Sequence, residues 1–363
     1  IFVMKGSPPD AVCSGTVAEC HGVPATEWRS LCDSARLLQH LAPWKWMEPS
    51  RMFGLSLSDS DQIVFISIMG GGENQNRAVF AFLGWEAFTH IRRRMADKNL
   101  TIRDLIETPA LQVTFVDAED AGDSDRAILE CGGMGNPLPE IVPLFRIHRT
   151  GYLPWLLNAD EVRTLRTILR QVAGVVMRAE NEPELLTSPG PEQIPVFGTD
   201  AAGHWRGEWQ PVPPASEFDS PVQIDAVKVA QVAALPPGNA RIQFDLALSR
   251  ATVGQAGQPL RTTYLMAAFD SRNGRCIGAD VIMPIDGLAT MWRSVPDRFL
   301  NLCLHAGSRP REIEVASEQM METLRPLQGH LPFKLTLRLR LPHFQNFLEE
   351  MNTLTHSKEQ EAQ

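Results

Sequence analysis

Cys13, Cys20 and His21 lie close together near the start of the chain and carry side chains that bind zinc. A structural zinc site needs four nitrogen or sulfur ligands in a tetrahedron. The residue two positions before Cys13, where a further cysteine would extend the group, is Ala11. Cys32 could supply a fourth ligand, but its spacing places it on the apolar side of a predicted helix. We therefore expect reduced thiols and no bound metal.

The run Gly70-Gly71-Gly72-Glu73 stands between a predicted strand and a predicted helix, which is the position of a phosphate-binding loop. Such loops carry a Lys followed by Ser or Thr to hold phosphate and magnesium, and this run has neither. Its glutamate also puts a negative charge where the anion would bind. A flexible turn that permits close packing is the favoured interpretation.

Three tryptophans, Trp44, Trp46 and Trp155, stand close to prolines, as in rigid aromatic platforms that bind a ligand or a peptide. The alternative is that their rings fill the core, because large aromatic rings are mostly buried.

Other common sites are missing from the sequence: there is no Gly-x-Ser-x-Gly elbow, no His-Glu-x-x-His pair and no dinucleotide-binding fingerprint.

Length and composition describe an ordinary globular protein. A chain of 363 residues favours two domains. The apolar runs Ile63–Met69 and Leu335–Leu341 are short beside the roughly 20 residues that a membrane-spanning helix needs. Six cysteines at uneven intervals do not indicate a disulfide framework. We therefore expect a cytoplasmic protein that contacts no membrane. Its net charge of −9 repels polyphosphate, so nucleic acid is not an expected partner.

The chain divides at a stretch rich in Pro, Glu, Ser and Gly. We expect a flexible arm over 1–25, an N-terminal α+β domain over 26–180, a linker over 181–222, a C-terminal α/β domain with a mixed sheet over 223–355, and a tail over 356–363. The predicted fold class is therefore α/β.

In the first domain, apolar spacing and turn residues predict a helix from Thr26 to Leu41, a hairpin of 52–57 and 63–69, a helix over 74–95, a strand over 111–116 and a short helix over 126–131. A further helix follows Asn158, because Asn158 and Glu161 have the spacing of a capping box.

In the second domain, the same signals predict a helix over 225–235, strands over 240–248, 262–269 and 276–283, a helix over 287–304, a strand over 312–316, a helix over 318–328, a strand over 333–341 and a helix over 342–354. Strands that alternate with helices in this way indicate parallel crossovers in a mixed sheet.

This order of elements in the second domain resembles a reduced ribonuclease-H-like fold. The resemblance implies two divalent metals held by carboxylates of the first strand, of a later strand end and of the last helix. Asp270, Glu318 and Glu349 lie at roughly these places. Each also has a structural interpretation: Asp270 precedes the turn dipeptide Asn273-Gly274 and can cap the turn, and the two glutamates are typical helix surface charges.

Two sets of residues resemble two uncharacterised bacterial domains that commonly adjoin. The first, with paired tryptophans, comprises Trp28, Ala35, Pro43-Trp44-Lys45-Trp46-Met47, Phe53-Gly54, Ser67-Ile68-Met69-Gly70, Gly84 and Gly151-Tyr152-Leu153-Pro154-Trp155, with Thr150 in place of that family's proline. The second comprises Leu265–Asp270, Gly274, Gly307, Arg309-Pro310-Arg311-Glu312-Ile313 and Leu341-Pro342. The resemblance implies a bacterial, cytoplasmic protein and carries over no catalytic residue.

The sequence therefore favours a noncatalytic binding or interaction protein, because no acid, base, nucleophile and metal-binding residues converge in it. We expect no cofactor, and a protein or small molecule as the partner. The alternative is a metal-dependent nucleic-acid hydrolase that acts through Asp270, Glu318 and Glu349.

Overall fold

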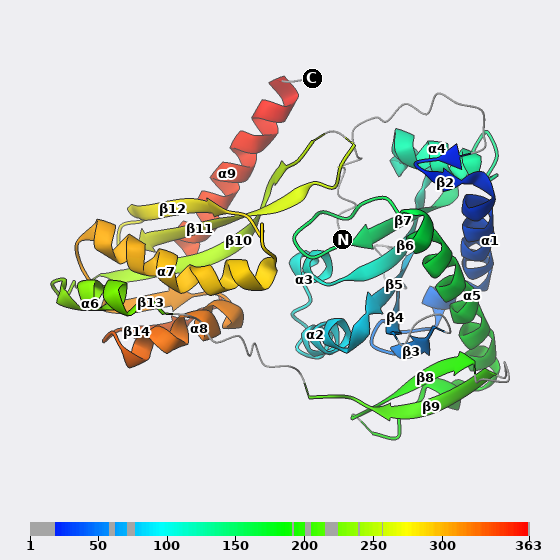
Figure 1. The fold of residues 1–363 in the computed structure, drawn as a ribbon, viewed down its shortest axis with the longest axis horizontal. Coiled ribbons are helices and arrows are strands. Elements are labelled where there is room, and N and C mark those ends of the chain that lie inside the picture. The colour runs from blue at the N-terminus through cyan, green and yellow to red at the C-terminus, as the bar shows by residue number, and fades with distance from the viewer. Residues whose placement is uncertain are drawn as a thin grey trace. The chain divides into compact units, whose positions relative to one another are not determined.

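The computed structural model describes residues 19–57, 62–70, 77–190, 192–199, 205–214, 224–238, 240–255 and 257–361 (Figure 1). The chain splits into two compact units, one of residues 1–217 and 255–259, the other of residues 218–254 and 260–363. Each unit combines helices with a sheet, which confirms the α/β fold class. Over the described residues, we find no helix with an apolar stretch long enough to span a bilayer.

A seven-stranded sheet forms the centre of the first unit, in the order β7-β6-β5-β4-β3-β8-β9. All neighbouring strands are antiparallel except β3 and β8, which are parallel. The strands are β3 (Phe53–Ser56), β4 (Ile63–Met69), β5 (Arg77–Leu83), β6 (Ala110–Asp117), β7 (Ile141–His148), β8 (Gln193–Thr199) and β9 (Trp205–Pro211). The predicted hairpin of β3 and β4 is confirmed.

Helices cover both faces of this sheet (Figure 1). Alternating residues of β4 show why: Val64, Ile66 and Ile68 face one core and Phe65 faces the other. The first core is completed by α1 (Ala25–Leu41), α4 (Asp123–Cys131) and α5 (Ala159–Asn181), the second by α2 (Gly84–Ala96) and α3 (Ile102–Glu107).

The helix predicted over 74–95 is wrong in its first half, where Arg77–Leu83 forms the strand β5. This run is buried on both faces of a central strand, so it shows neither the helical nor the strand period. The glycine run therefore joins two strands, β4 and β5, rather than a strand and a helix. Residues 71–76 lie outside the described residues, but Gly70 permits close packing, because a Cβ there would lie 2.5 Å from Cβ of Trp44.

Short strands lie inside two segments that we expect to be an arm and a linker. β1 (Glu19–Cys20) pairs with β2 (Val23–Pro24) within 1–25, of which residues 1–18 lie outside the described part. β8 and β9 lie within 181–222 and extend the first sheet. The outer limits of the domains and the linker stay a prediction.

The second unit contains a five-stranded mixed sheet in the order β12-β11-β10-β13-β14. Its strands are β10 (Arg241–Val253), β11 (Arg261–Asp270), β12 (Cys276–Ile282), β13 (Glu312–Val315) and β14 (Lys334–Leu337). β10, β11 and β12 are antiparallel, whereas β13 is parallel to both β10 and β14, as the alternating pattern predicts.

One face of this sheet packs against α6 (Ala226–Ala234), α7 (Leu288–Ala306) and α8 (Glu318–Leu324). On the other face, Ala267 and Phe269 form a small core with Phe344 of α9 (Pro342–Glu361). Gln243, on the same face of β10, accepts the His343 N–H at 2.9 Å and so holds the first turn of α9. The central strand β10 therefore contacts helices on both sides.

Candidate functional site

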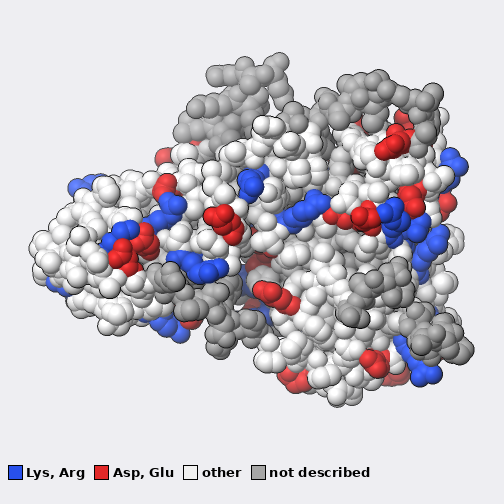
Figure 2. Space-filling model, viewed as in Figure 1, with Lys and Arg blue, Asp and Glu red and all other residues white. Residues whose placement is uncertain are grey.

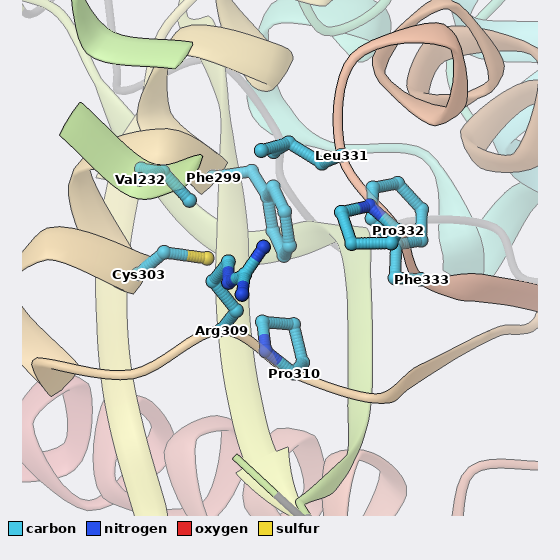
Figure 3. A pocket seen from close by; sticks show the side chains of 8 residues that line it. All are labelled: Val232, Phe299, Cys303, Arg309, Pro310, Leu331, Pro332 and Phe333. Carbon is cyan, nitrogen blue, oxygen red and sulfur yellow. The ribbon is translucent and has the colours of Figure 1, made fainter. Parts of the chain in front are cut away.

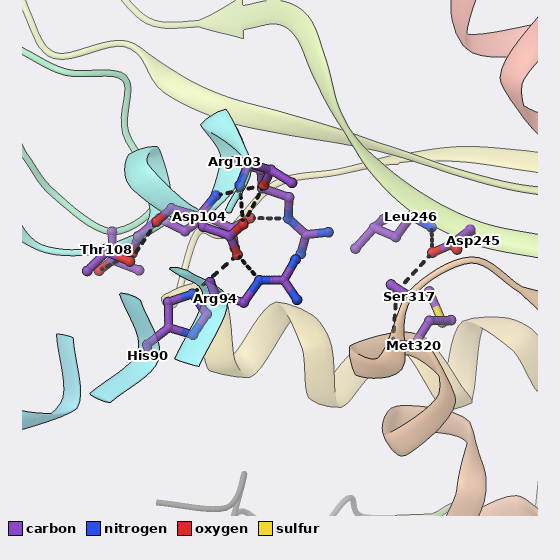
Figure 4. Close-up of polar contacts among 12 residues, drawn as sticks. His90, Arg94, Arg103, Asp104, Thr108, Asp245, Leu246, Ser317 and Met320 are labelled. Carbon is purple, nitrogen blue, oxygen red and sulfur yellow. Dashed lines mark hydrogen bonds and ion pairs between the residues drawn. The ribbon is translucent and has the colours of Figure 1, made fainter. Parts of the chain in front are cut away.

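Asp245 lies in the middle of β10, and its side chain is buried. Its Oδ1 accepts the N–H of Leu246 at 2.8 Å and its Oδ2 accepts the N–H of Ala316 at 2.6 Å. The Ser317 hydroxyl, which caps α8 by accepting the Met320 N–H, lies 3.5 Å from Oδ1 (Figure 4). The carboxylate thus ties the end of β13 and the start of α8 to the central strand.

Two further buried carboxylates, Glu312 and Glu314, stand on β13, on the same face of the sheet as Asp245, because they pair with Arg241 and Gln243. Three cations neutralise them: Arg241, Lys334 and Arg338. The Thr336 hydroxyl donates to Glu312 at 2.8 Å. This hydrogen bond and the three cations hold the pKa of Glu312 below its usual value, although burial opposes them. The negative charges of Glu312 and Glu314 are therefore balanced by neighbouring cations.

The three carboxylates singled out in the sequence form no metal-binding group in the part of the chain that the structure describes. Asp270 ends β11 beside Ile242, near the start of β10, and its Oδ1 accepts the Arg272 N–H at 2.9 Å. Glu318 is the first residue of α8, beyond the far end of β13. Glu349 is exposed on α9. Asp270 therefore has the contacts of a turn cap.

The three tryptophans differ in exposure. Trp44 is buried, with its ring centroid 4.9 Å from that of Phe115. Trp155 pairs its backbone with Ile147 and packs partly buried against the first core. Trp46 is 36% exposed. A binding role for the three stays a prediction, and Trp46 offers the most accessible ring.

Cys20 and His21 lie at the tight turn between β1 and β2, whereas Cys13 lies outside the described residues. Cys20 is buried, and its carbonyl oxygen accepts the Trp28 indole N–H at 3.0 Å. Burial lowers the pKa of His21 and raises the pKa of the Cys32 thiol to about 12. The expectation of a chain without zinc stays a prediction.

In the first unit, the buried Asp104 joins α2 to α3 (Figure 4). It accepts the Thr101 N–H at 2.8 Å and the Thr101 hydroxyl at 2.5 Å, and it pairs with Arg94 at 3.1 Å and His90 at 3.3 Å. Burial alone would raise the pKa of Asp104, but these partners outweigh burial and hold the pKa far below its usual range. The carboxylate is a fully bonded cap.

His148 is buried at the end of β7, with Nδ1 3.0 Å from the carbonyl oxygen of Leu105 and Nε2 2.6 Å from the side-chain amide of Gln112. Burial lowers the pKa of His148 to about 4, and the nearby charge of Arg146 acts in the same direction. The imidazole is therefore neutral at neutral pH. The oxygens of Leu105 and Gln112 lie beside the two ring nitrogens, and the single N–H of the neutral ring donates to one of them, so His148 stabilises the fold.

A small pocket in the second unit lies between α6, α7 and two loop segments, 309–310 and 331–333 (Figure 3). Its walls are apolar except for Cys303 and Arg309. Figure 3 shows the Arg309 guanidinium directed toward the ring of Phe299, with the Cys303 sulfur facing it. The Nε atom of Arg309 is buried and has no hydrogen-bond partner among the described residues. Sequence reasoning missed this pocket and Asp245, although an acidic residue within the apolar run 242–248 is itself a signal.

Comparison with known proteins gives two matches. Residues 28–196 match a family described as "Domain of unknown function (DUF7309)", and residues 228–352 match one described as "Domain of unknown function (DUF6930)". No curated protein matches the chain. The chain therefore carries two adjoining domains of unknown function, which confirms its resemblance to an uncharacterised two-domain family.

Proposed function

We propose that this protein is a noncatalytic binding protein whose second domain keeps a ribonuclease-H-like sheet without a working metal site. Three antiparallel strands followed by two parallel strands, with helices at the crossovers, support the comparison with that fold. The comparison concerns the fold alone, since one fold serves many functions.

The state of Asp245 carries the proposal. Asp270, which the sequence suggested for the first-strand ligand, ends the second strand β11. The acidic residue on the first strand β10 is Asp245, and both of its oxygens accept backbone N–H groups. Two divalent metals need several carboxylates around them. The residues that follow β13 are Ala316 and Ser317, and the described residues bring no metal-binding group of three side chains together. Asp245 therefore serves the fold.

Charge also argues against a nucleic-acid substrate. Figure 2 shows acidic and basic side chains interspersed over the face that it draws, and the net charge is −9. Tight binding of polyphosphate depends on clustered Lys and Arg.

The free thiols of the described cysteines support a location in the cytoplasm, and the resemblance to bacterial domains supports a bacterial origin.

The test compares thermal unfolding and nuclease activity of the wild type, Asp245→Asn and the exposed control Asp286→Asn, with and without millimolar Mg²⁺ or Mn²⁺. We expect Asp245→Asn to lower the free energy of unfolding by about 2 kcal/mol, because one acceptor oxygen becomes an NH2 group that faces a backbone N–H and the charge that strengthens the other hydrogen bond is lost. The loss is the same with and without metal, the control is unchanged, and no variant cleaves DNA or RNA.

A rise in wild-type melting temperature on adding metal that disappears in Asp245→Asn, together with cleavage that disappears with it, overturns the proposal. Ions that bind only the folded state stabilise it, so a metal site would raise the melting temperature in this measurement.

A further inference from the structure

The strand β14 lies at one edge of the second sheet, and no other described strand pairs with its outer side (Figure 1). The N–H groups of Lys334 and Arg338 point inward, because they donate to carbonyl oxygens of β13 and of the residue before it, at 3.0 and 2.8 Å. Backbone groups alternate in direction along a strand, so the N–H and C=O groups of Leu335 and Leu337 point outward. A further strand can pair with them.

This edge is positively charged, although the whole chain carries −9. The segment 334–340 contains Lys334, Arg338 and Arg340 and no acidic residue. Lys334 and Arg338 share the two buried carboxylates of β13 with Arg241. Arg340 is exposed and forms no ion pair with the described residues. The two carboxylates therefore do not neutralise the cations of this edge, which attracts a negatively charged partner.

Leucines alternate with these cations along the edge. Leu335 packs partly against the core that α7 and α8 form with the sheet, whereas Leu337 is 44% exposed. Leu339, just beyond the strand, is fully exposed. Charged side chains alone keep other chains away from a sheet edge, but exposed leucines beside them favour an interaction. The edge therefore offers apolar contacts as well as charge.

We infer that β14 binds an extended acidic segment of a partner protein, which adds a strand to the sheet. Acidic and apolar residues alternate in such a segment, because successive side chains of a strand point to opposite faces. Its carboxylates lie beside Lys334 and Arg338, and its apolar side chains lie beside Leu335 and Leu337. This inference names a partner for the binding protein proposed above and rests on that function.

A second copy of this chain fits the edge less well. Two copies that extend the sheet about a twofold axis pair β14 antiparallel. With the axis at Thr336, Lys334 lies opposite Arg338, and with the axis at Leu337 it lies opposite Arg340. Like charges directly opposite each other destabilise strand pairing. An acidic segment instead meets each cation with an opposite charge.

The probe is the peptide acetyl-Glu-Val-Glu-Val-Glu-Val-Glu-amide, with binding to the full chain followed by calorimetry and by NMR of the labelled protein at low salt. We expect the peptide to bind and to slow hydrogen exchange of the Leu335 and Leu337 amides, which point to the added strand. A peptide with lysine in place of each glutamate is the charge control and should not bind.

Backbone pairing is tested with two further peptides, one methylated on the backbone nitrogen of every valine and the other on that of every glutamate. Only alternate N–H groups of an added strand face β14. One of the two methylated peptides should therefore lose binding, and the other should keep it.

Two exposed side chains test the edge without disturbing the fold. Arg340→Glu should weaken binding of the acidic peptide by roughly tenfold or more, and Leu339→Ser by a smaller factor. Arg293→Glu, at an exposed arginine of α7, is the matched control and should bind like the wild type. The ligand-free variants should melt at the wild-type temperature, because each changed side chain is exposed.

Equal binding of the acidic and basic peptides, equal binding of the two methylated peptides, or no binding at millimolar concentration contradicts the inference. So does an equal loss in Arg340→Glu and Arg293→Glu. Tighter binding of single-stranded oligothymidylate than of the peptide, or a dimer in sedimentation that Leu339→Ser dissociates, shows a different occupant of β14 and overturns the inference. Asp245 and metal ions enter none of these readouts, so such a failure is distinct from a failure of the proposed function.

Discussion

Asp104 in the first unit and Arg309 in the second are charged side chains with opposite surroundings. Asp104 accepts two hydrogen bonds from Thr101 and pairs with His90 and Arg94, so that its charge is compensated within the fold. Arg309 buries its Nε atom with no hydrogen-bond partner in the described part of the chain. Asp104 is therefore held by partners within the fold, whereas Arg309 is half-exposed and the rest of its guanidinium is open to water.

The largest expected effect tests the compensated side of this comparison. Asp104→Ala removes the acceptor that joins α2 to α3 and the carboxylate that forms an ion pair with Arg94. We expect the free energy of unfolding of the first unit to fall by about 3 kcal/mol or more, as for other buried pairs that lose one member. Urea unfolding and amide hydrogen exchange in α3 measure it.

Asp97→Ala is the control for this change, since Asp97 is exposed and its ion pair with Arg93 is long, at 4.0 Å. It should alter stability by less than about 0.5 kcal/mol. If the two variants lose equal stability, compensation of a buried charge is not what distinguishes Asp104.

A second prediction concerns pH and the buried neutral ring of His148. Its pKa is about 4 in the folded chain, whereas an unfolded chain has a histidine pKa near 6.5. Between these values the unfolded state binds a proton that the folded state excludes. The free energy of unfolding should therefore fall as the pH is lowered from about 6.5 to 4, and His148 should account for up to roughly 3 kcal/mol of this fall. Above about pH 6.5, His148 should make no contribution to the pH dependence.

Hydrogen exchange of β6 and β7 amides against pH measures this dependence in the first unit alone. His148→Gln should flatten the slope even though it lowers stability at neutral pH, and His305→Gln, an exposed histidine of α7, should leave the slope intact. An unchanged slope in His148→Gln would show that another group carries the dependence.

The smallest expected effect belongs to Asp270, whose Oδ1 accepts the Arg272 N–H at 2.9 Å. Asp270→Ala removes one turn hydrogen bond and should cost about 1 kcal/mol, equally with and without Mg²⁺. Glu349→Ala, on the exposed side of α9, should cost less than half as much. Chemical unfolding in both buffers measures this. A loss that grows when the metal is present would show that Asp270 is a metal ligand and not a turn cap.

Elements with strong local signals could be predicted from the sequence. Asn158 and Glu161 form the expected capping box, with hydrogen bonds of 2.9 and 3.0 Å. Asp270 was readable as a turn residue because Asn273-Gly274 follows it. The run Arg77–Leu83 could not be assigned, because a strand buried on both faces has no period that separates it from a helix.

The polar residues that matter most depend on partners far along the chain. The burial of the Asp245 carboxylate is explained by its hydrogen bond from the N–H of Ala316, and no local sequence pattern predicts this contact. The pocket around Arg309 is built from α7 and from the loop before β14, so its apolar surroundings appear only after the sheet has formed.

The two strands that pair with β3 are synthesised at very different times. β4 follows it at once, but β8, which pairs with Gly54 and Leu55, leaves the ribosome only after the whole of α5. Until then β3 ends the nascent sheet with unpaired backbone groups, which are a template for pairing with another chain. The first sheet therefore exposes an edge that can pair with another chain until β8 has been made and pairs with β3.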